Sequence, residues 1–158
     1  MPTVGTPETL YSKGVALRKE GQWAAAIEML ELAGKSPSYQ LKSQAQIGLC
    51  HRSMGDHGAA ILAFRAALTD ESASRTEVLD VRYFLARTLE SAGQIVEAAT
   101  LYRRMAQMNP RFKDVTFRAK ELSSRPKHPT NGKRVVASNG SWFGNAIESF
   151  NQLIGGRK

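Results

Sequence analysis

The sequence predicts an all-α fold, a solenoid of antiparallel helical hairpins, and an internal repeat is the main evidence for it. Five residues recur after an interval of 34 positions: Gly14, Gly21, Ala26, Ile27 and Ala33 return as Gly48, Gly55, Ala60, Ile61 and Ala67. The apolar residues around them lie three and four positions apart, which is the spacing of one face of a helix. A fixed period with small residues in phase is typical of a helical repeat array rather than of an enzyme core.

The first hairpin is expected to begin after a short lead, residues 1–6. Thr6 can cap a helix that starts at Pro7, and a proline is tolerated in the first helical turn. Gly21 then breaks the helix. A second helix follows, with an apolar stripe made of Trp23, Ala26, Ile27, Leu30 and Ala33. Small residues at 14 and 26 let the two helices cross closely.

The second hairpin repeats this plan around the turn at Gly55, and the third is displaced. Its turn glycine, Gly93, follows Gly55 by 38 residues, so four extra residues are expected near 70–74, as a longer turn or an added helical turn. A capping helix is predicted over 111–124, because a last hairpin would otherwise expose an apolar face. Its stripe is Phe112, Val115, Ala119 and Leu122.

These landmarks resemble the tetratricopeptide repeat (TPR) family. That family has a small residue at repeat position 8, a glycine at the turn between the helices, and alanine at positions 20 and 27. Gly14 and Gly48 match position 8, Ala26 and Ala60 match position 20, and Ala33 and Ala67 match position 27. The resemblance implies a TPR-type superhelical solenoid over 7–124, with repeats at about 7–40, 41–74 and 79–110 before the cap.

The same resemblance implies a concave groove lined by the first helix of each repeat. The family's ligand contacts come mainly from repeat positions 2, 5, 6, 9, 12 and 13. The matching groove residues are Tyr11, Val15, Arg18, Lys19, Lys42, Gln46, Leu49, Arg52, Tyr83, Phe84, Arg87 and Glu90. Packing between hairpins is the alternative role for Leu49 and Phe84, and plain solvent exposure is the alternative for Arg18 and Arg87.

Apolar groove residues beside cationic ones suit a partner segment with apolar anchors and some acidic character. The chaperone-binding type of TPR grips a C-terminal carboxylate with Lys and Asn at positions 5 and 9 of its first repeat. Those positions hold Tyr11 and Val15 here, so a chaperone tail is not the expected ligand.

Catalytic and cofactor patterns are missing from the 158 residues. The chain has no Walker-type lysine motif and no HExxH, and Cys50 with the three histidines lacks the spacing of a metal site. One cysteine forms no internal disulfide, and the first residues lack the basic and apolar segments of a secretory signal. We therefore expect a cytoplasmic, non-catalytic protein without metal or cofactor.

The net charge of +8 comes mostly from the last residues. Residues 125–141 read as a basic flexible linker, 142–154 as an amphipathic helix, and 155–158 as a basic end. The helix would dock through Trp142, Phe143, Ile147, Phe150 and Ile154, either in this chain's own groove or on another copy or a partner, or it would pack as plain structure.

The sequence thus favours a protein-binding adaptor or scaffold that takes a partner peptide or helix in its concave groove. The alternative is an assembly factor that attaches its basic tail to an anionic membrane surface or to a nucleic-acid backbone. The tail helix has no Lys or Arg on its polar face, unlike a typical interfacial helix, so this second class is less favoured.

Overall fold

A computed structural model of the chain describes residues 5–71 and 73–125. Within them the chain forms seven α-helices and no strand, so the all-α prediction is confirmed. The helices are α1 (Pro7–Lys19), α2 (Trp23–Gly34), α3 (Pro37–Ser53), α4 (His57–Ala67), α5 (Arg75–Ser91), α6 (Ile95–Met108) and α7 (Val115–Ser124). The expected linker and tail helix, residues 125–154, lie outside the described residues from 126 onward.

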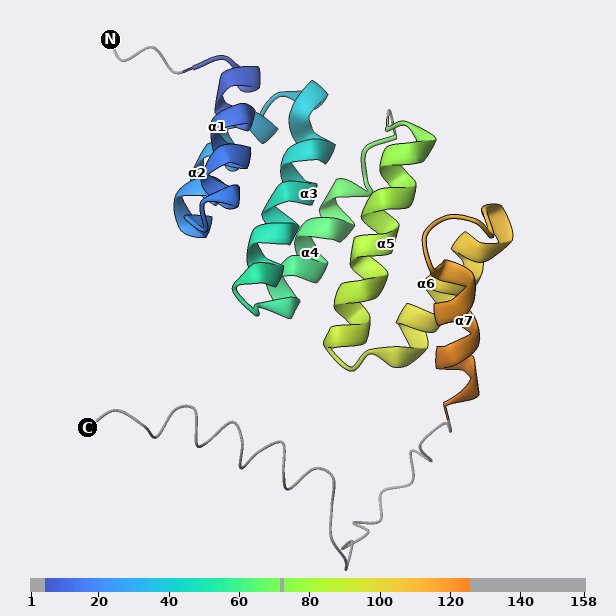
Figure 1. Ribbon diagram of the computed structural model, residues 1–158. Helices are drawn as coiled ribbons and strands as arrows, with labels where there is room; N and C mark the ends of the chain where they lie inside the picture. Colours follow the sequence, from blue (N-terminus) through green and yellow to red (C-terminus); the bar gives the residue numbers. More distant parts are fainter. Residues whose placement is uncertain (1–4, 72, 126–158) are drawn as a thin grey trace, which may run out of the picture. The chain divides into compact units, whose positions relative to one another are not determined.

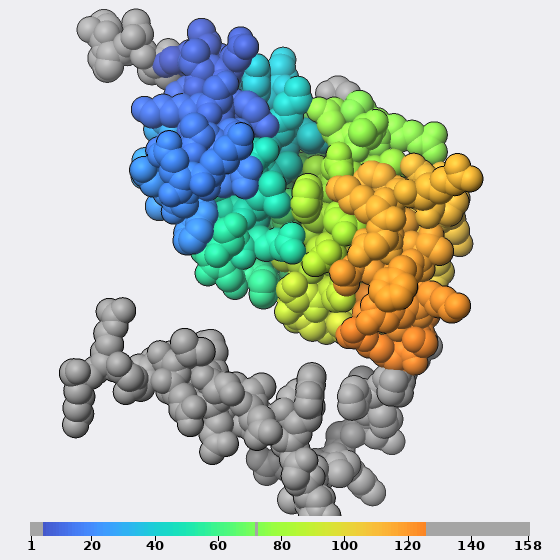
Figure 2. All heavy atoms as spheres, viewed as in Figure 1, coloured from blue at the N-terminus to red at the C-terminus, as the bar shows by residue number. Residues whose placement is uncertain are grey.

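The seven helices stack in chain order (Figure 1). Each helix packs on the next, and the first helices of neighbouring hairpins, α1, α3 and α5, also adjoin one another. Three antiparallel hairpins result, α1–α2, α3–α4 and α5–α6, with α7 laid against α6. Figure 2 shows the face on which α1, α3, α5 and α7 follow one another from blue to orange.

The turns inside the three hairpins have one geometry. Gly21, Gly55 and Gly93 have φ angles of 78°, 81° and 77°, in the left-handed region that glycine enters without strain. The backbone N–H after each glycine donates to the carbonyl five residues earlier, as Gln22 does to Leu17 at 2.9 Å. This hydrogen bond defines the Schellman ending of a helix, so each turn glycine ends the first helix of its hairpin.

Helix starts are fixed by capping side chains and prolines. The Thr6 hydroxyl accepts the backbone N–H of Thr9 at 3.3 Å, and the Asp56 carboxylate accepts that of Ala59 at 2.9 Å. Ser74 and Glu77 form a reciprocal capping box at the start of α5. The first helices of the second and third hairpins therefore begin at Pro37 and Arg75, one turn before the repeat starts expected at 41 and 79.

The extra residues of the third repeat lengthen a connection. Seven positions separate α4 from α5, whereas two separate α2 from α3, and α3 and α5 have the same length of 17 residues. Of the two possibilities that the sequence left open, the structure has the longer connection.

The capping helix is shorter than predicted. It begins at Val115 rather than at 111, because Lys113 adopts a φ of 48°, which is incompatible with a right-handed helix. Val115, Ala119 and Leu122 are buried, as their stripe predicted, while Phe112 packs against the same core from the preceding turn.

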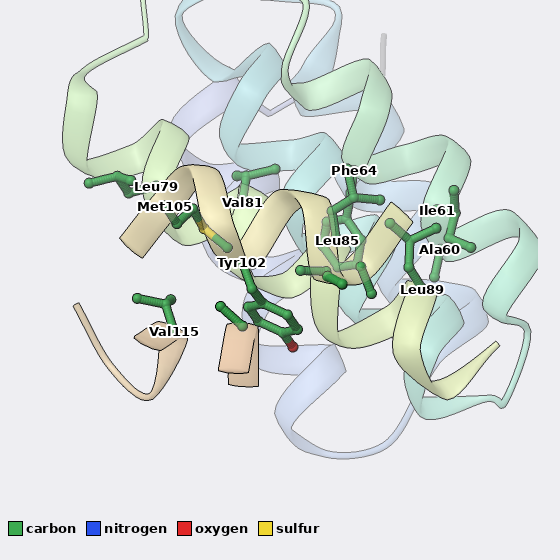
Figure 3. Packing of buried hydrophobic residues seen from close by; sticks show 14 of the residues in the cluster. Ala60, Ile61, Phe64, Leu79, Val81, Leu85, Leu89, Tyr102, Met105 and Val115 are labelled. Atoms are coloured by element: carbon green, nitrogen blue, oxygen red, sulfur yellow. The ribbon is translucent and has the colours of Figure 1, made fainter. Parts of the chain in front are cut away.

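The core runs along the contacts between the helices (Figure 3). Gly14 faces Leu30 and Gly48 faces Phe64, and a Cβ added at either glycine would lie 2.7 Å or 2.6 Å from the nearest atom of that side chain. Leu30 and Phe64 are both fully buried. The small residues thus permit the close crossing of the two helices in the first and second hairpins.

Candidate protein-binding groove

A hollow of about 270 Å³ lies between the first helices of the three hairpins. It is contributed by α1, α3 and α5, and we call it the α3 hollow. Its walls are largely apolar, with charged side chains on the rim. The lining residues are Tyr11, Leu41, Lys42, Ala45, Gln46, Leu49, Glu77, Asp80, Val81 and Phe84.

Five of the groove residues predicted from the sequence meet in the α3 hollow: Tyr11, Lys42, Gln46, Leu49 and Phe84. The Gln46 amide nitrogen donates to the Tyr11 hydroxyl at 3.4 Å, which ties α3 to α1. The Gln46 amide oxygen is buried and has no hydrogen-bond partner among the described residues. Leu49 and Phe84 are half-buried and also pack against the core, so they serve both the hollow and the packing between hairpins.

Five lining residues were not predicted, and two of them are carboxylates: Glu77 and Asp80, with Leu41, Ala45 and Val81. Glu77 lies before the repeat start expected at 79, because α5 extends one turn further than that numbering assumed. The capping-box pattern Ser74-x-x-Glu77 is the sequence signal that could have placed it. The rim is therefore of mixed charge, with Lys42 at 3.9 Å from Glu77.

Four other predicted residues, from the later turns of α1 and α3, do not line the hollow. They are Val15, Arg18, Lys19 and Arg52. Val15 packs against the core near Leu30. The three cations have no carboxylate within 4.0 Å in the part of the chain that the structure describes. Burial raises the pKa of the Cys50 thiol, and the nearby charge of Arg18 opposes this in part.

Of the remaining predicted groove residues, Tyr83 and Glu90 bind the cap, and Arg87 bonds to Tyr83. The Tyr83 hydroxyl donates to the Asp114 carboxylate at 2.8 Å and accepts a bond from Arg87 at 3.3 Å. Arg118 of α7 reaches both oxygens of Glu90 at 3.0 Å and the Asp114 carboxylate at 2.7 Å. The structure therefore places these three residues in a contact between α5 and α7, which we call the α7 cluster.

Partial burial sets the electrostatics of the α7 cluster. The side chains of Arg118 and Glu90 are 20% and 17% exposed. The Tyr102 hydroxyl donates to Glu90 at 3.2 Å, and burial, followed by the charge of Glu90, raises the pKa of that phenol well above its usual range. Burial alone would raise the pKa of the Asp114 carboxyl, but the hydrogen bonds from Tyr83 and Arg118 and the charge of Arg118 hold it below its ordinary value.

The depressed pKa of Asp114 predicts an acid-dependent contribution to stability. Because the folded-state pKa lies below the unfolded one, the contribution is complete above the ordinary carboxyl pKa and is lost as pH falls through the folded value. The difference in unfolding free energy between wild type and Asp114→Asn should be constant at neutral pH and should shrink below about pH 4. Denaturant titrations at several pH values measure it. Glu28→Gln, an exposed change on α2, is the control, and a difference that does not shrink contradicts the prediction.

The described helices include none that is long and apolar enough to span a membrane. Their His, Cys, Asp and Glu side chains do not gather in groups of three that could hold a metal ion.

The comparisons with known proteins agree with this architecture. Residues 41–69 match the model of the tetratricopeptide repeat. The first TPR of Spaghetti (RPAP3), solved with an HSP90 peptide, superposes with a TM-score of 0.63 at 16% identity over 75% of this chain and 93% of that one. The solenoid has the tetratricopeptide-repeat fold. The TPR prediction made from Gly14, Gly48 and the alanines is confirmed.

Two further TPR structures are similar. The TPR domain of Arabidopsis OM64 has a TM-score of 0.61 at 19% identity, covering 75% of this chain and 94% of that chain. The Yersinia enterocolitica type III secretion chaperone SycD, in complex with a peptide of the translocator YopD, has a TM-score of 0.62 at 15% identity, covering 73% and 91%. A search of curated protein sequences finds no significant match.

Proposed function

We propose that this TPR protein is a non-catalytic adaptor that binds a segment of a partner protein in the α3 hollow. One observation carries the proposal: an apolar hollow on the face formed by α1, α3 and α5, with hydrogen-bonding and charged groups on its rim. Ligand sites typically combine apolar walls with a few polar groups that orient the ligand. Two of the similar TPR structures were solved with a peptide of another protein, which supports the same class of function.

The charges around the hollow suggest which partner chemistry fits. Glu77 and Asp80 stand on its rim, while Arg18 and Arg52, on later turns of α1 and α3, have no carboxylate partner among the described residues. A partner segment with an apolar anchor in the hollow and an acidic residue facing Arg18 and Arg52 fits this arrangement. Charge of this kind orients a ligand and speeds its association, while the buried anchor supplies most of the affinity.

The HSP90 peptide bound to the RPAP3 domain does not define the expected ligand. Tyr11 and Val15 stand where the chaperone-binding type has Lys and Asn, and here Tyr11 bonds to Gln46 while Val15 packs in the core. An internal segment with an apolar anchor is the better candidate than a free C-terminal carboxylate.

In this proposal the apolar and basic tail, residues 126–158, competes with the partner segment for the α3 hollow. Its residues Trp142 to Ile154 carry the apolar groups, and the flanking Lys and Arg residues complement Glu77 and Asp80. Tethering by a short linker gives such a segment a high effective concentration, so docking within one chain needs only weak intrinsic affinity.

A peptide-display selection against the full chain, followed by calorimetric titration of the selected peptide, tests the proposal. Ala45→Phe adds a ring to the lining of the α3 hollow, at a partly buried position beside the core, so it should weaken binding at least about tenfold, or about 1.4 kcal/mol. Ala16→Phe, at an exposed position of α1, is the matched control and should leave the affinity unchanged.

Two outcomes would contradict the proposal: no peptide that binds saturably, or equal affinities for the two variants. The same titration on a chain without residues 126–158 tests the competitor. Tighter binding is expected if the tail occupies the hollow, and unchanged binding rejects that part alone.

A further inference from the structure

A lysine side chain of the protein itself is held among three aromatic rings at the edge of the α3 hollow. The Lys113 ammonium lies 4.4 Å from the centre of the Tyr83 ring, 5.0 Å from that of Phe84 and 4.9 Å from that of Phe112. Its nitrogen is 2.6 Å from an oxygen of Asp80. We call the four side chains Asp80, Tyr83, Phe84 and Phe112 the cation cage.

The rings of the cage are arranged around one point. Tyr83 stands edge-on to both neighbours, with interplanar angles of 68° to Phe84 and 86° to Phe112 and centroid distances of 6.1 Å and 6.0 Å. A cation over a ring face is attracted by the negative charge density of that face, more strongly where the site is desolvated. Three rings and one carboxylate therefore form a site whose chemistry selects an alkylammonium or guanidinium group.

The backbone at Lys113 indicates that the side chain is held by the cage. Its φ of 48° is the one left-handed value of a non-glycine residue among those described, and this conformation is unfavourable for an L residue. Lys113 belongs to the short connection between α6 and α7 rather than to a helix. The contacts of its ammonium offset this backbone cost.

The cage and the α3 hollow are continuous, because Asp80 and Phe84 belong to both. Other charges nearby are already engaged: Asp114 binds Tyr83 and Arg118, and Arg87 donates to the Tyr83 hydroxyl. Lys113 is thus the group that fills the cage, and its side chain as a whole is 36% exposed.

We propose that the cation cage is a recognition site for a lysine or arginine of the bound partner, and that Lys113 is a tethered competitor that occupies it when no partner is bound. This inference rests on the proposed function for the identity of the partner. The partner segment then carries a basic residue next to the apolar anchor that enters the hollow. The apparent affinity of the partner's basic residue for the cage is its intrinsic affinity multiplied by the fraction of molecules in which Lys113 has left the cage.

The cage is tested apart from any protein partner, with tetramethylammonium chloride as the probe. The full chain carrying Lys113→Ala is titrated, and the ring-proton signals of Tyr83, Phe84 and Phe112 are followed by NMR. We expect saturable shifts with the variant and at least about tenfold weaker binding to wild type, in which Lys113 competes. Asp80→Asn added to Lys113→Ala should weaken binding again.

Neopentyl alcohol, which is neutral, similar in shape and made water-soluble by one added hydroxyl, should not bind. Lys120→Ala, an exposed lysine on α7, is the matched control and should behave as wild type. Equal binding of the neutral probe, equal binding to wild type, or no saturable shift with Lys113→Ala would overturn the proposal. If that variant loses its helical signal, Lys113→Gly, which suits the left-handed backbone, gives the same comparison. If tetramethylammonium does not bind the cage, the prediction for the peptide titration with Ala45→Phe still stands, so one proposal can be rejected without the other.

Discussion

Gly48→Leu should lower the free energy of unfolding by about 3 kcal/mol, the upper end of the range for overfilling a packed core. A Cβ at Gly48 would lie 2.6–2.8 Å from three atoms of the Phe64 ring, and that ring is fully buried. Phe64 also stacks on Phe84 of the next hairpin, at 6.1 Å between centroids, so the Phe64 ring cannot shift away from Gly48 without disturbing that contact. Denaturant unfolding followed by circular dichroism measures the change.

The matched control is Gly58→Leu in α4. A Cβ there meets only the Asp56 carboxylate, at 3.6 Å, so leucine adds helix propensity without a clash. That variant should be more stable than wild type by about 0.5 kcal/mol. Similar stabilities for the two leucine variants would show that the crossing at Gly48 is not tight and would contradict the packing account. Gly48→Ala should fall between them, because one methyl meets the same ring atoms but also favours the helix.

The period of the sequence predicted the fold because its small residues have direct steric causes. Gly48 must be small where Phe64 crosses it, and Gly55 must be able to adopt a φ of 81°. Such local requirements recur in every hairpin, so they appear in the sequence as a repeat. Of the eight groove residues that the same numbering predicts on α1 and α3, Tyr11, Lys42, Gln46 and Leu49 line the hollow, whereas Val15, Arg18, Lys19 and Arg52 do not.

The third hairpin departed from the prediction because it meets a different neighbour. The repeat numbering places Tyr83, Arg87 and Glu90 on the groove side of α5 but does not say which of them the predicted cap contacts, and in the structure Asp114 and Arg118 bind Tyr83 and Glu90. Asp114 lies 31 residues from Tyr83 and Arg118 lies 28 residues from Glu90, so no local sequence pattern indicates these pairings. The cap thus forms hydrogen bonds and an ion pair with polar residues of α5. A further repeat would have left these residues unpaired.

A tertiary contact also explains why the capping helix begins later than predicted. The periodicity of the sequence predicts a helix that includes residues 111–114, since Phe112 is in phase with Val115 and Ala119. The ion pair of Lys113 with Asp80 and its three ring contacts favour a left-handed residue there, and the helix begins later. A tertiary contact of this kind overrides local propensity, which is weak by comparison.

Arg118→Met should lower the free energy of unfolding by about 2 kcal/mol, because it leaves two partly buried carboxylates, Glu90 and Asp114, without their cation. The methionine keeps most of the aliphatic stem, so lost packing contributes little. Hydrogen exchange should rise in α7 before it rises in α1–α4, since each element of a solenoid contacts only its neighbours. Denaturant unfolding and amide exchange measure the two effects.

Arg125→Met is the matched control, because Arg125, the residue that follows α7, pairs with Glu121 of that helix at 3.2 Å, and the two side chains are 49% and 39% exposed. Exposed pairs of this kind contribute about 0–1 kcal/mol, so its loss should be small. Equal losses for the two variants would mean that α7 is held by its apolar stripe alone, through Val115, Ala119 and Leu122. In that case Glu90 would be available to a ligand at little cost, and the groove would extend beyond the cation cage to α7. A larger loss for Arg118→Met instead limits the groove to the α3 hollow and its cation cage.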